Sequence, residues 1–471
     1  MNMNSSKNEL FTNVKPVKAL AIMAIPTILS QLVVLIYNLA DTFFIGSTDN
    51  PYMVAGSSLG LTIFMLAVAL SNVFGVGGGA LMARLIGEKK IEDAKNVVSF
   101  TLIVAFISSI IFSLLVLAVM HPLLIAMGAT ENTLEYAKQY VLFTTVIGGL
   151  PCIMSMCMAQ LLRNSGYSKE AGLGIIIGSV LNIGLDPLFM FVILPKGQEV
   201  LGAGLATLIS NVICFAYFIF FFVRLRNVTP LSIPYKWVKI DNSYKKSIFG
   251  VGLPAALAIL LFDIITILTN RISASYGDIS LAAMGIVLKV ERIPINVGLG
   301  ICLGMVPLVA YNFGARNLNR VKKFFLLTSI AVLIFSLICS ILFFFLSEPI
   351  ISIFIKNEET IVQGGFFLKG RCFALPLIIF GYVLTNYMNA VGKGIISLLF
   401  AIIRHIAIIL PIMILMNHIW NINGFTWSQL VADALNIVIC LFIFILVNKK
   451  ITQRHLGHFS NSDEIIDNNF N

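Results

Sequence analysis

Two aspartates, Asp41 and Asp186, interrupt stretches of this chain that are otherwise apolar. An ionisable group in mid-membrane costs at least about 2.5 kcal/mol, so one that is retained is a candidate for function. Asn182 lies four residues before Asp186 and shares its helix face. Pro187 removes an amide donor and can free the carbonyl of Ile183. Together these groups can bind a proton, Na⁺ or an organic cation. The alternative is that each aspartate only pairs with a neighbouring helix.

A second polar group occurs later in the chain and consists of Asp263, Lys289, Glu291 and Arg292. On a helix, Lys289 and Arg292 share a face and Glu291 points elsewhere, so we expect Glu291 to pair with another helix. Asp263 is the expected partner of Lys289. Both a structural salt bridge and a functional polar site stay open for this group.

Other signals are weaker. Pro26 lies fifteen residues before Asp41 and is expected to kink its helix and provide a hinge. Arg371 and Arg404 are expected to snorkel or pair. The seven cysteines contain no CxxC pair, so neither a disulfide framework nor a zinc site is indicated. The sequence has no nucleophile–base pair, metal cluster or cofactor motif, so we expect neither enzyme activity nor a cofactor.

The elements that carry these residues are long and apolar. The chain is 58% hydrophobic and only 11% charged, whereas soluble domains average about 25% charged residues. A membrane-spanning helix needs about 20 apolar residues. Twelve stretches qualify: 17–45, 52–83, 96–120, 134–161, 170–194, 200–223, 248–276, 279–310, 324–347, 360–388, 395–417 and 423–447. The apolar runs are continuous rather than alternating, which indicates an all-α integral membrane protein rather than a β-barrel.

The positive charges predict the orientation of these spans. The net charge is +10, which alone might suggest a nucleic-acid partner. With a cytoplasmic N-terminus, however, most lysines and arginines fall in cytoplasmic segments, and only Lys196 and Lys356 fall in outside loops. The positive-inside rule therefore places both termini in the cytoplasm. We expect cytoplasmic segments at 1–16 and 224–247, the latter a basic linker, and a disordered cytoplasmic tail at 448–471.

The sequence also contains an internal repeat. Residues 17–223 and 248–447 carry related phrases at an offset of 225–229, which falls to about 222 near the end of each half. Pro26 corresponds in this way to Pro254, and Ala83 to Ala310. Each half has six spans, so both halves begin on the same side and are related by a pseudo-two-fold axis along the membrane normal. Two copies of one membrane unit are typical of a transporter with its site between the copies.

Four phrases resemble the multidrug and toxic compound extrusion (MATE) family, in the bacterial DNA-damage-inducible-type branch that includes a staphylococcal multidrug exporter. They are LADTFFIG at 39–46, LNIGLDPLF at 181–189, GAGLAT at 202–207 and PLVAYNFGA at 307–315. The resemblance runs through both halves, over about residues 15–450.

This resemblance implies a secondary active exporter that exchanges cationic or amphiphilic small molecules for H⁺ or Na⁺. The family's ion site falls on Asp41, Asn182, Asp186 and Thr207, and its proline-bent first helix falls on Pro26. Asp263 lies near an ion-binding acid of another branch, but one residue further from the proline. We expect a monomer in the bacterial plasma membrane, with the lipid bilayer as its surroundings and no nucleic-acid partner.

Two alternatives stay open. A lipid-linked oligosaccharide flippase of the same superfamily would use a basic cavity, which Lys289, Arg292 and Arg371 could offer. The twelve spans and the two acids count against it. A passive channel is the alternative from a different class, although a ring of repeated subunits suits a channel better than two unequal halves.

Overall fold

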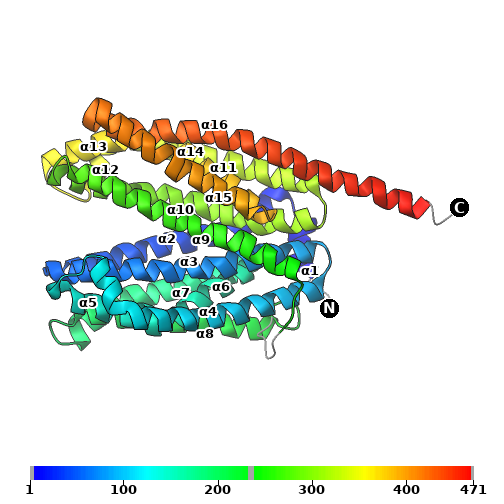
Figure 1. Ribbon diagram of the computed structural model, residues 1–471, viewed down its shortest axis with the longest axis horizontal. Coiled ribbons are helices and arrows are strands. Elements are labelled where there is room, and N and C mark those ends of the chain that lie inside the picture. Colours follow the sequence, from blue (N-terminus) through cyan, green and yellow to red (C-terminus); the bar gives the residue numbers. More distant parts are fainter. Residues whose placement is uncertain (1–4, 232–237, 468–471) are drawn as a thin grey trace.

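A computed structural model describes residues 5–231 and 238–467, without the side chains of residues 5–8, 263, 452 and 454–467. Within these ranges all regular secondary structure is helical. Figure 1 shows two layers of helices: the first half of the chain, blue to green, forms the lower layer, and the second half, green to red, forms the upper one. We call these layers the N-lobe and the C-lobe.

The N-lobe follows a short helix, α1 (Ser5–Thr12). Its helices are α2 (Pro16–Gly46), α3 (Pro51–Gly87), α4 (Ile91–Ala126), α5 (Glu131–Val141), α6 (Gly149–Asn164), α7 (Ser168–Pro187) and α8 (Glu199–Leu225). Two π-helical segments interrupt this order, η1 (Leu142–Ile147) between α5 and α6 and η2 (Leu188–Ile193) after α7.

The C-lobe repeats this arrangement. Its helices are α9 (Asn242–Ala274), α10 (Asp278–Gly314), α11 (Leu318–Phe345), α12 (Ser347–Ser352), α13 (Glu358–Cys372), α14 (Leu375–Ala390), α15 (Gly394–Ile402) and α16 (Leu410–Asp467), with the π-helical η3 (Ile403–Ile409) between the last two.

The described residues account for the twelve expected spans. Nine helical segments are long and apolar enough to cross a membrane, and two bent pairs, α5–η1 with α6 (50°) and α13 with α14 (47°), raise the count to eleven. The segment Gly394–Ile451 counts once in this total, but its backbone leaves the helical region at Asn421 (φ 50°, ψ −136°). The chain reverses there, which yields a twelfth span.

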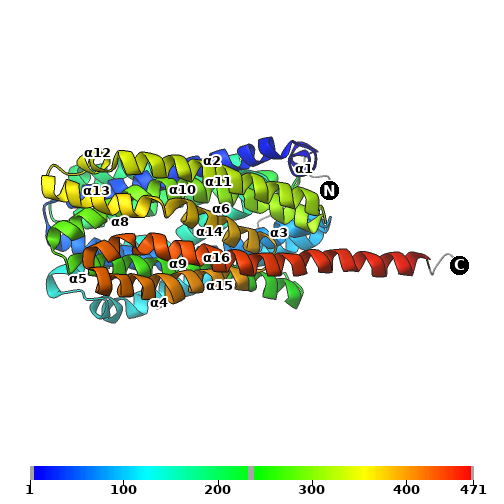
Figure 2. The same cartoon turned by 90° about the horizontal axis from the view of Figure 1, so that it is seen from above.

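The structure refines two of the expected spans and changes the expected tail. The stretches 134–161 and 360–388 are bent rather than straight, because backbone bonding shifts to the π pattern at η1 and because Pro376 supplies no amide donor at the start of α14. The tail after Lys450 was expected to be disordered, yet α16 continues to Asp467 and projects beyond the bundle (Figures 1 and 2). Extending an existing helix needs no new nucleus, which favours this continuation.

Backbone geometry confirms the internal repeat. Lys89 and Arg316 are at matching positions and both have a positive φ, 62° and 58°. Gly166 and Gly392 also match, with φ of 87° and 80°. A left-handed residue is uncommon outside glycine, so its recurrence at equivalent positions indicates two copies of one unit.

The lobes contact each other closely at the end that carries both termini. Glycines there let the helix backbones meet: a Cβ on Gly87 of α3 would lie 2.0 Å from the carbonyl oxygen of Tyr311, and one on Gly314 of α10 would lie 2.0 Å from that of Arg84. We call this contact surface between the lobes the seam. Further along it, Gly304 of α10 approaches Ala24 of α2. Among the described glycines, the contacts between lobes all lie in this half of the helices, so the terminus-bearing end is closed.

A methyl group at this seam tests the close packing. Gly87→Ala places a Cβ against backbone that cannot rotate away, so we expect the closed form to lose about 1–3 kcal/mol. The matched control is Gly381→Ala in α14, where nothing lies within 4 Å and alanine should stabilise the helix slightly. Thermal unfolding in detergent measures both. Equal unfolding temperatures for the two variants would contradict the close packing at Gly87.

Candidate functional site

Asp41 and Asp186 are both buried in the N-lobe. Asp41 lies on α2 with 8% of its surface exposed, and Asp186 lies near the end of α7 with 0% exposed. The hydroxyl of Tyr140 donates to Oδ2 of Asp41 at 3.4 Å, whereas its Oδ1 has no hydrogen-bond partner. An unpartnered buried carboxylate oxygen is costly, and this atom is chemically able to take up a proton or a cation.

Asn182 links Asp186 to Thr207 of α8. Its amide nitrogen lies 3.4 Å from Oδ1 of Asp186 and 3.3 Å from the hydroxyl of Thr207. The amide fits better when it is turned over: the nitrogen then donates to Oδ2 of Asp186 at 3.2 Å, and the oxygen accepts from the backbone N–H of Thr207 at 3.2 Å. The four predicted site residues Asp41, Asn182, Asp186 and Thr207 are therefore buried in one lobe, three of them in direct contact.

Among the described side chains, neither aspartate is neutralised by a salt bridge, since no lysine or arginine nitrogen lies within 4 Å of either carboxylate. The two are nevertheless close enough for the charge of Asp41 to act on Asp186, and both act on Tyr37. The partners of the two carboxylates among the described side chains are neutral: Asp41 bonds to a tyrosine hydroxyl of the neighbouring helix α5, and Asp186 to the amide of Asn182 on its own helix.

Two tyrosines of this site were missed by sequence reasoning. Tyr37 lies one helical turn before Asp41, and this spacing alone would have placed it on the same face. Tyr140 comes from α5, ninety-nine residues from its partner Asp41, and no local pattern could reveal that contact. Carboxylate, amide and hydroxyl oxygens are suitable ligands for Na⁺ and equally suitable for a proton or an organic ammonium.

Pro26 connects this site to the seam between the lobes. It lies inside the continuous helix α2, and its carbonyl packs against Gly172 of α7, where a Cβ would come within 2.7 Å. On either side of it, Ala24 approaches Gly304 and Ile28 approaches Gly300, both on α10. A change of bend at Pro26 would therefore alter the contact between lobes.

In the C-lobe, Glu291 pairs with Arg371 of α13. The guanidinium makes two hydrogen bonds to the carboxylate, of 2.9 and 3.0 Å, and both side chains are buried. The prediction that Glu291 pairs with another helix is confirmed. Arg404 of η3 likewise donates to Asp433 of α16 at 2.8 Å, and Gln429 donates to the second oxygen of that carboxylate.

The repeat shows what the C-lobe carries at the positions of the N-lobe site. At the offset of 226 that relates Gly166 to Gly392, Asn182 and Asp186 of α7 correspond to Ile408 and Ile412. At the offset of Pro26 to Pro254, Asp41 corresponds to Thr269. The equivalent positions of the C-lobe thus carry no acid, and the described buried acids of this lobe are held by arginines.

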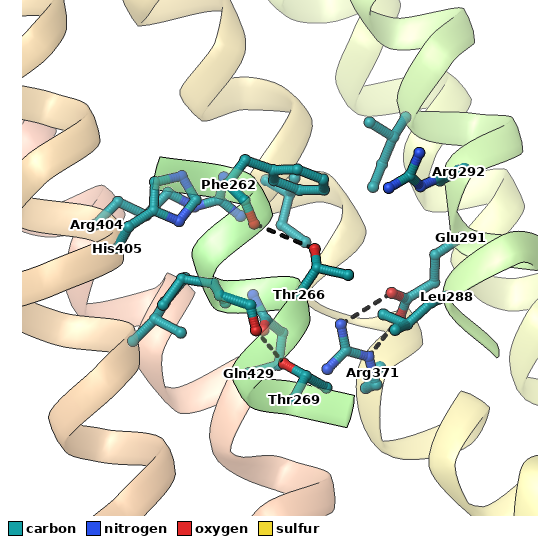
Figure 3. A pocket seen from close by; sticks show the side chains of 14 residues that line it. Phe262, Thr266, Thr269, Leu288, Glu291, Arg292, Arg371, Arg404, His405 and Gln429 are labelled. Atoms are coloured by element: carbon teal, nitrogen blue, oxygen red, sulfur yellow. Dashed lines mark hydrogen bonds and ion pairs between the residues drawn. The ribbon is translucent and has the colours of Figure 1, made fainter. Parts of the chain in front are cut away.

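A small pocket lies beside these pairs (Figure 3). It holds about 50 Å³ and is lined by α9, α10, η3 and neighbouring helices. Arg292 points toward it with its guanidinium 5.8 Å from the ring centre of Phe262. His405 is buried at its edge, with a ring nitrogen that lacks a partner. Lys289 is exposed. The side chain of Asp263 lies outside the described residues, so its pairing with Lys289 stays a prediction.

The buried ion pair should behave differently from an exposed one. Glu291→Gln leaves Arg371 buried without its counter-charge, and we expect a loss of about 3–5 kcal/mol in stability. Glu291→Leu combined with Arg371→Met should recover most of it. Glu348→Gln is the control, because Glu348 pairs with Lys369 at an exposed site and should change stability by about 1 kcal/mol or less. Thermal unfolding of the wild type and these three variants measures this, and a double variant no more stable than Glu291→Gln would argue against the pairing.

Comparison with known proteins identifies the family of this chain. The family model MatE matches residues 26–188 and again residues 254–415, so each lobe contains one copy of the same unit. The multidrug export protein MepA of Staphylococcus saprophyticus is 28% identical over 435 residues, covering 92% of this chain and 95% of the relative. MepA of Staphylococcus aureus strain MSSA476 is 29% identical with the same coverage.

Solved structures share the fold. A MATE in complex with MaD5 matches with a TM-score of 0.87 at 23% identity, covering 94% of this chain and 98% of the other. A MOP superfamily transporter from Pyrococcus furiosus Vc1, with a binding pocket of reverse polarity, matches with a TM-score of 0.86 at 24% identity, covering 96% and 99%. Since the family model covers most of both lobes, this multipass membrane protein belongs to the MatE family.

Proposed function

We propose that this protein exports amphiphilic cations across the bacterial plasma membrane in exchange for H⁺ or Na⁺. The observation that carries the proposal is the pair of buried acids, Asp41 and Asp186, which no lysine or arginine neutralises among the described side chains. Such a pair needs a mobile positive charge. The name of the MepA relatives, multidrug export protein, supports export of varied small molecules.

Competition for one electrostatic site would couple the two fluxes. A cationic substrate is favoured while both acids are ionised. Binding of H⁺ or Na⁺ from the other side removes that negative charge and releases the substrate. Because Asp41, Pro26 and the contacts with α10 share helix α2, the same binding event can reshape the seam between the lobes.

We infer the orientation from the charges. Both termini lie at one end of the bundle (Figure 1), as an even number of spans requires. The positive-inside rule supports a cytoplasmic location for this end, and the proposed mechanism places the closed contact between the lobes on the cytoplasmic side.

The buried ion pair of Arg371 counts against a flippase. Of the three cations that a basic cavity could use, Arg371 is held by Glu291. Lys289 and Arg292, which have no acid within 4 Å among the described side chains, are exposed rather than buried. An ion-coupled carrier is further distinguished from a passive channel by counterflow, in which labelled substrate accumulates against an imposed ion gradient.

Removing either acid should uncouple transport. Asp41→Asn and Asp186→Asn keep the shape of the side chain but lose its charge, so we expect export to fall at least about tenfold. Asp278→Asn, at an exposed position at the start of α10, is the control and should export normally. Export into inverted vesicles, with pH and Na⁺ gradients imposed separately, measures this and identifies the coupling ion. Wild-type rates in both variants would place the site elsewhere.

Substrate binding should depend on the coupling ion. If H⁺ is the partner, affinity for an organic cation falls as pH falls, because protonation removes the negative charge, by no more than about tenfold per pH unit for each proton. If Na⁺ is the partner, affinity falls as Na⁺ rises. Titration of purified protein across pH, with and without Na⁺, tests both. An affinity that responds to neither ion would exclude a shared site.

A further inference from the structure

The N-terminal segment before α2 lies in the seam between the two lobes. Phe11, in α1, is 1% exposed and Leu10 is 4% exposed. The ring of Phe11 stacks on Tyr311 of α10 in the C-lobe, with centroids 4.6 Å apart and planes 15° apart. On its other side it approaches Gly166 at the end of α6 in the N-lobe, where a Cβ would lie 3.0 Å from the ring. One side chain thus contacts both lobes.

Polar contacts fix the backbone of this segment to the C-lobe. The carbonyl oxygen of Phe11 accepts hydrogen bonds from Asn312 at 3.2 Å and from Nε of Arg320 at 2.8 Å. The carbonyl oxygen of Val14 accepts a further one from Nη2 of Arg320 at 2.5 Å. The segment is covalently continuous with α2 of the N-lobe. Arg320 thus also holds the link between α1 and α2 at Val14. Any separation of α2 from α10 would strain these hydrogen bonds directly.

The repeat shows why an additional segment occupies this place. Arg84 is the repeat equivalent of Tyr311, and Gly392 is the equivalent of Gly166. Arg84 reaches across the seam into the corner at Gly392 and donates to the carbonyl of Ala390 at 3.1 Å.

The matching corner at Gly166 is filled differently. The atoms nearest to a Cβ there belong to Phe11 and Leu10. Phe11, stacked on Tyr311, therefore takes the place that Arg84 occupies in the other copy.

We propose that residues 10–14 form a strap that holds the terminus-bearing end closed, and that Phe11 and Arg320 are positioning residues that must release whenever this end opens. The inference rests on the proposed alternation between lobes. Opening separates α2 from α10, so the strap must give up its stacking on Tyr311 and its hydrogen bonds to Arg320 in each cycle. A strap that holds too weakly shifts the population toward the form open at this end.

Spin labels on the two lobes test the strap. Cysteines at Glu92 and Lys393, one exposed residue on each lobe near this end, would report their separation in protein freed of its native cysteines. We expect Phe11→Ala and Arg320→Ala each to raise the ratio of long to short separations by about tenfold, the scale of one lost buried contact. The controls Phe345→Ala and Lys322→Ala change exposed side chains and should leave the distribution unchanged. Identical distributions in all four variants would overturn the proposal.

A covalent tether gives a second test that does not depend on the aromatic stacking itself. Phe11→Cys with Tyr311→Cys, joined by a short cross-linker, should stop export, and cleavage of the linker by a reductant should restore it. Export at the wild-type rate with the cross-link complete would overturn the strap. The distance measurement does not depend on export, so a protein that shows the strap effect but exports nothing would reject the proposed function alone.

Discussion

Charge inside a membrane must be balanced, and the two lobes of this protein balance it in opposite ways. In the C-lobe, Glu291 and Asp433 each pair with an arginine on another helix, so both negative charges are neutralised inside the protein. In the N-lobe, the partners of Asp41 and Asp186 among the described side chains are a tyrosine and an asparagine. A hydroxyl or an amide satisfies a hydrogen bond but supplies no charge. The N-lobe therefore stays one or two positive charges short, and this deficit is what a transported or coupling cation can fill.

The deficit matters mechanically because of its location on α2. The same helix carries Asp41, then Pro26 fifteen residues earlier, then the contacts of Ala24 and Ile28 with glycines of α10. At those contacts no glycine side chain separates the two helix backbones, and a single added methyl group would overlap backbone atoms. Packed interfaces of this kind tend to switch between discrete arrangements rather than deform gradually. A small change near Asp41 can thus be converted into opening or closing of the seam.

The sequence predicted the features that depend on residues close to one another in the chain or on repeated segments. Hydropathy and the repeated phrases predicted the spans and the two lobes, and the four-residue spacing of Asn182 and Asp186 predicted their contact. Contacts between distant segments could not be predicted in the same way. Arg371 lies eighty residues from Glu291, and Arg320 lies 309 residues from Phe11. The bend at η1 arises from a shift in backbone bonding rather than from a proline within it, so composition gave no sign of it.

Duplication alone would give both lobes the same chemistry. The proposed coupling of ion and substrate depends on the differences between the two copies. The C-lobe carries Thr269, Ile408 and Ile412 at the positions of Asp41, Asn182 and Asp186, and its own acid Asp433 is held by Arg404. In the proposed mechanism, one lobe responds to cations while its partner stays electrostatically fixed. The seam shows the same asymmetry, with Arg84 crossing it in one corner and the N-terminal strap crossing it in the other. Ion binding can move one lobe against the other only if the two lobes respond differently to the ion.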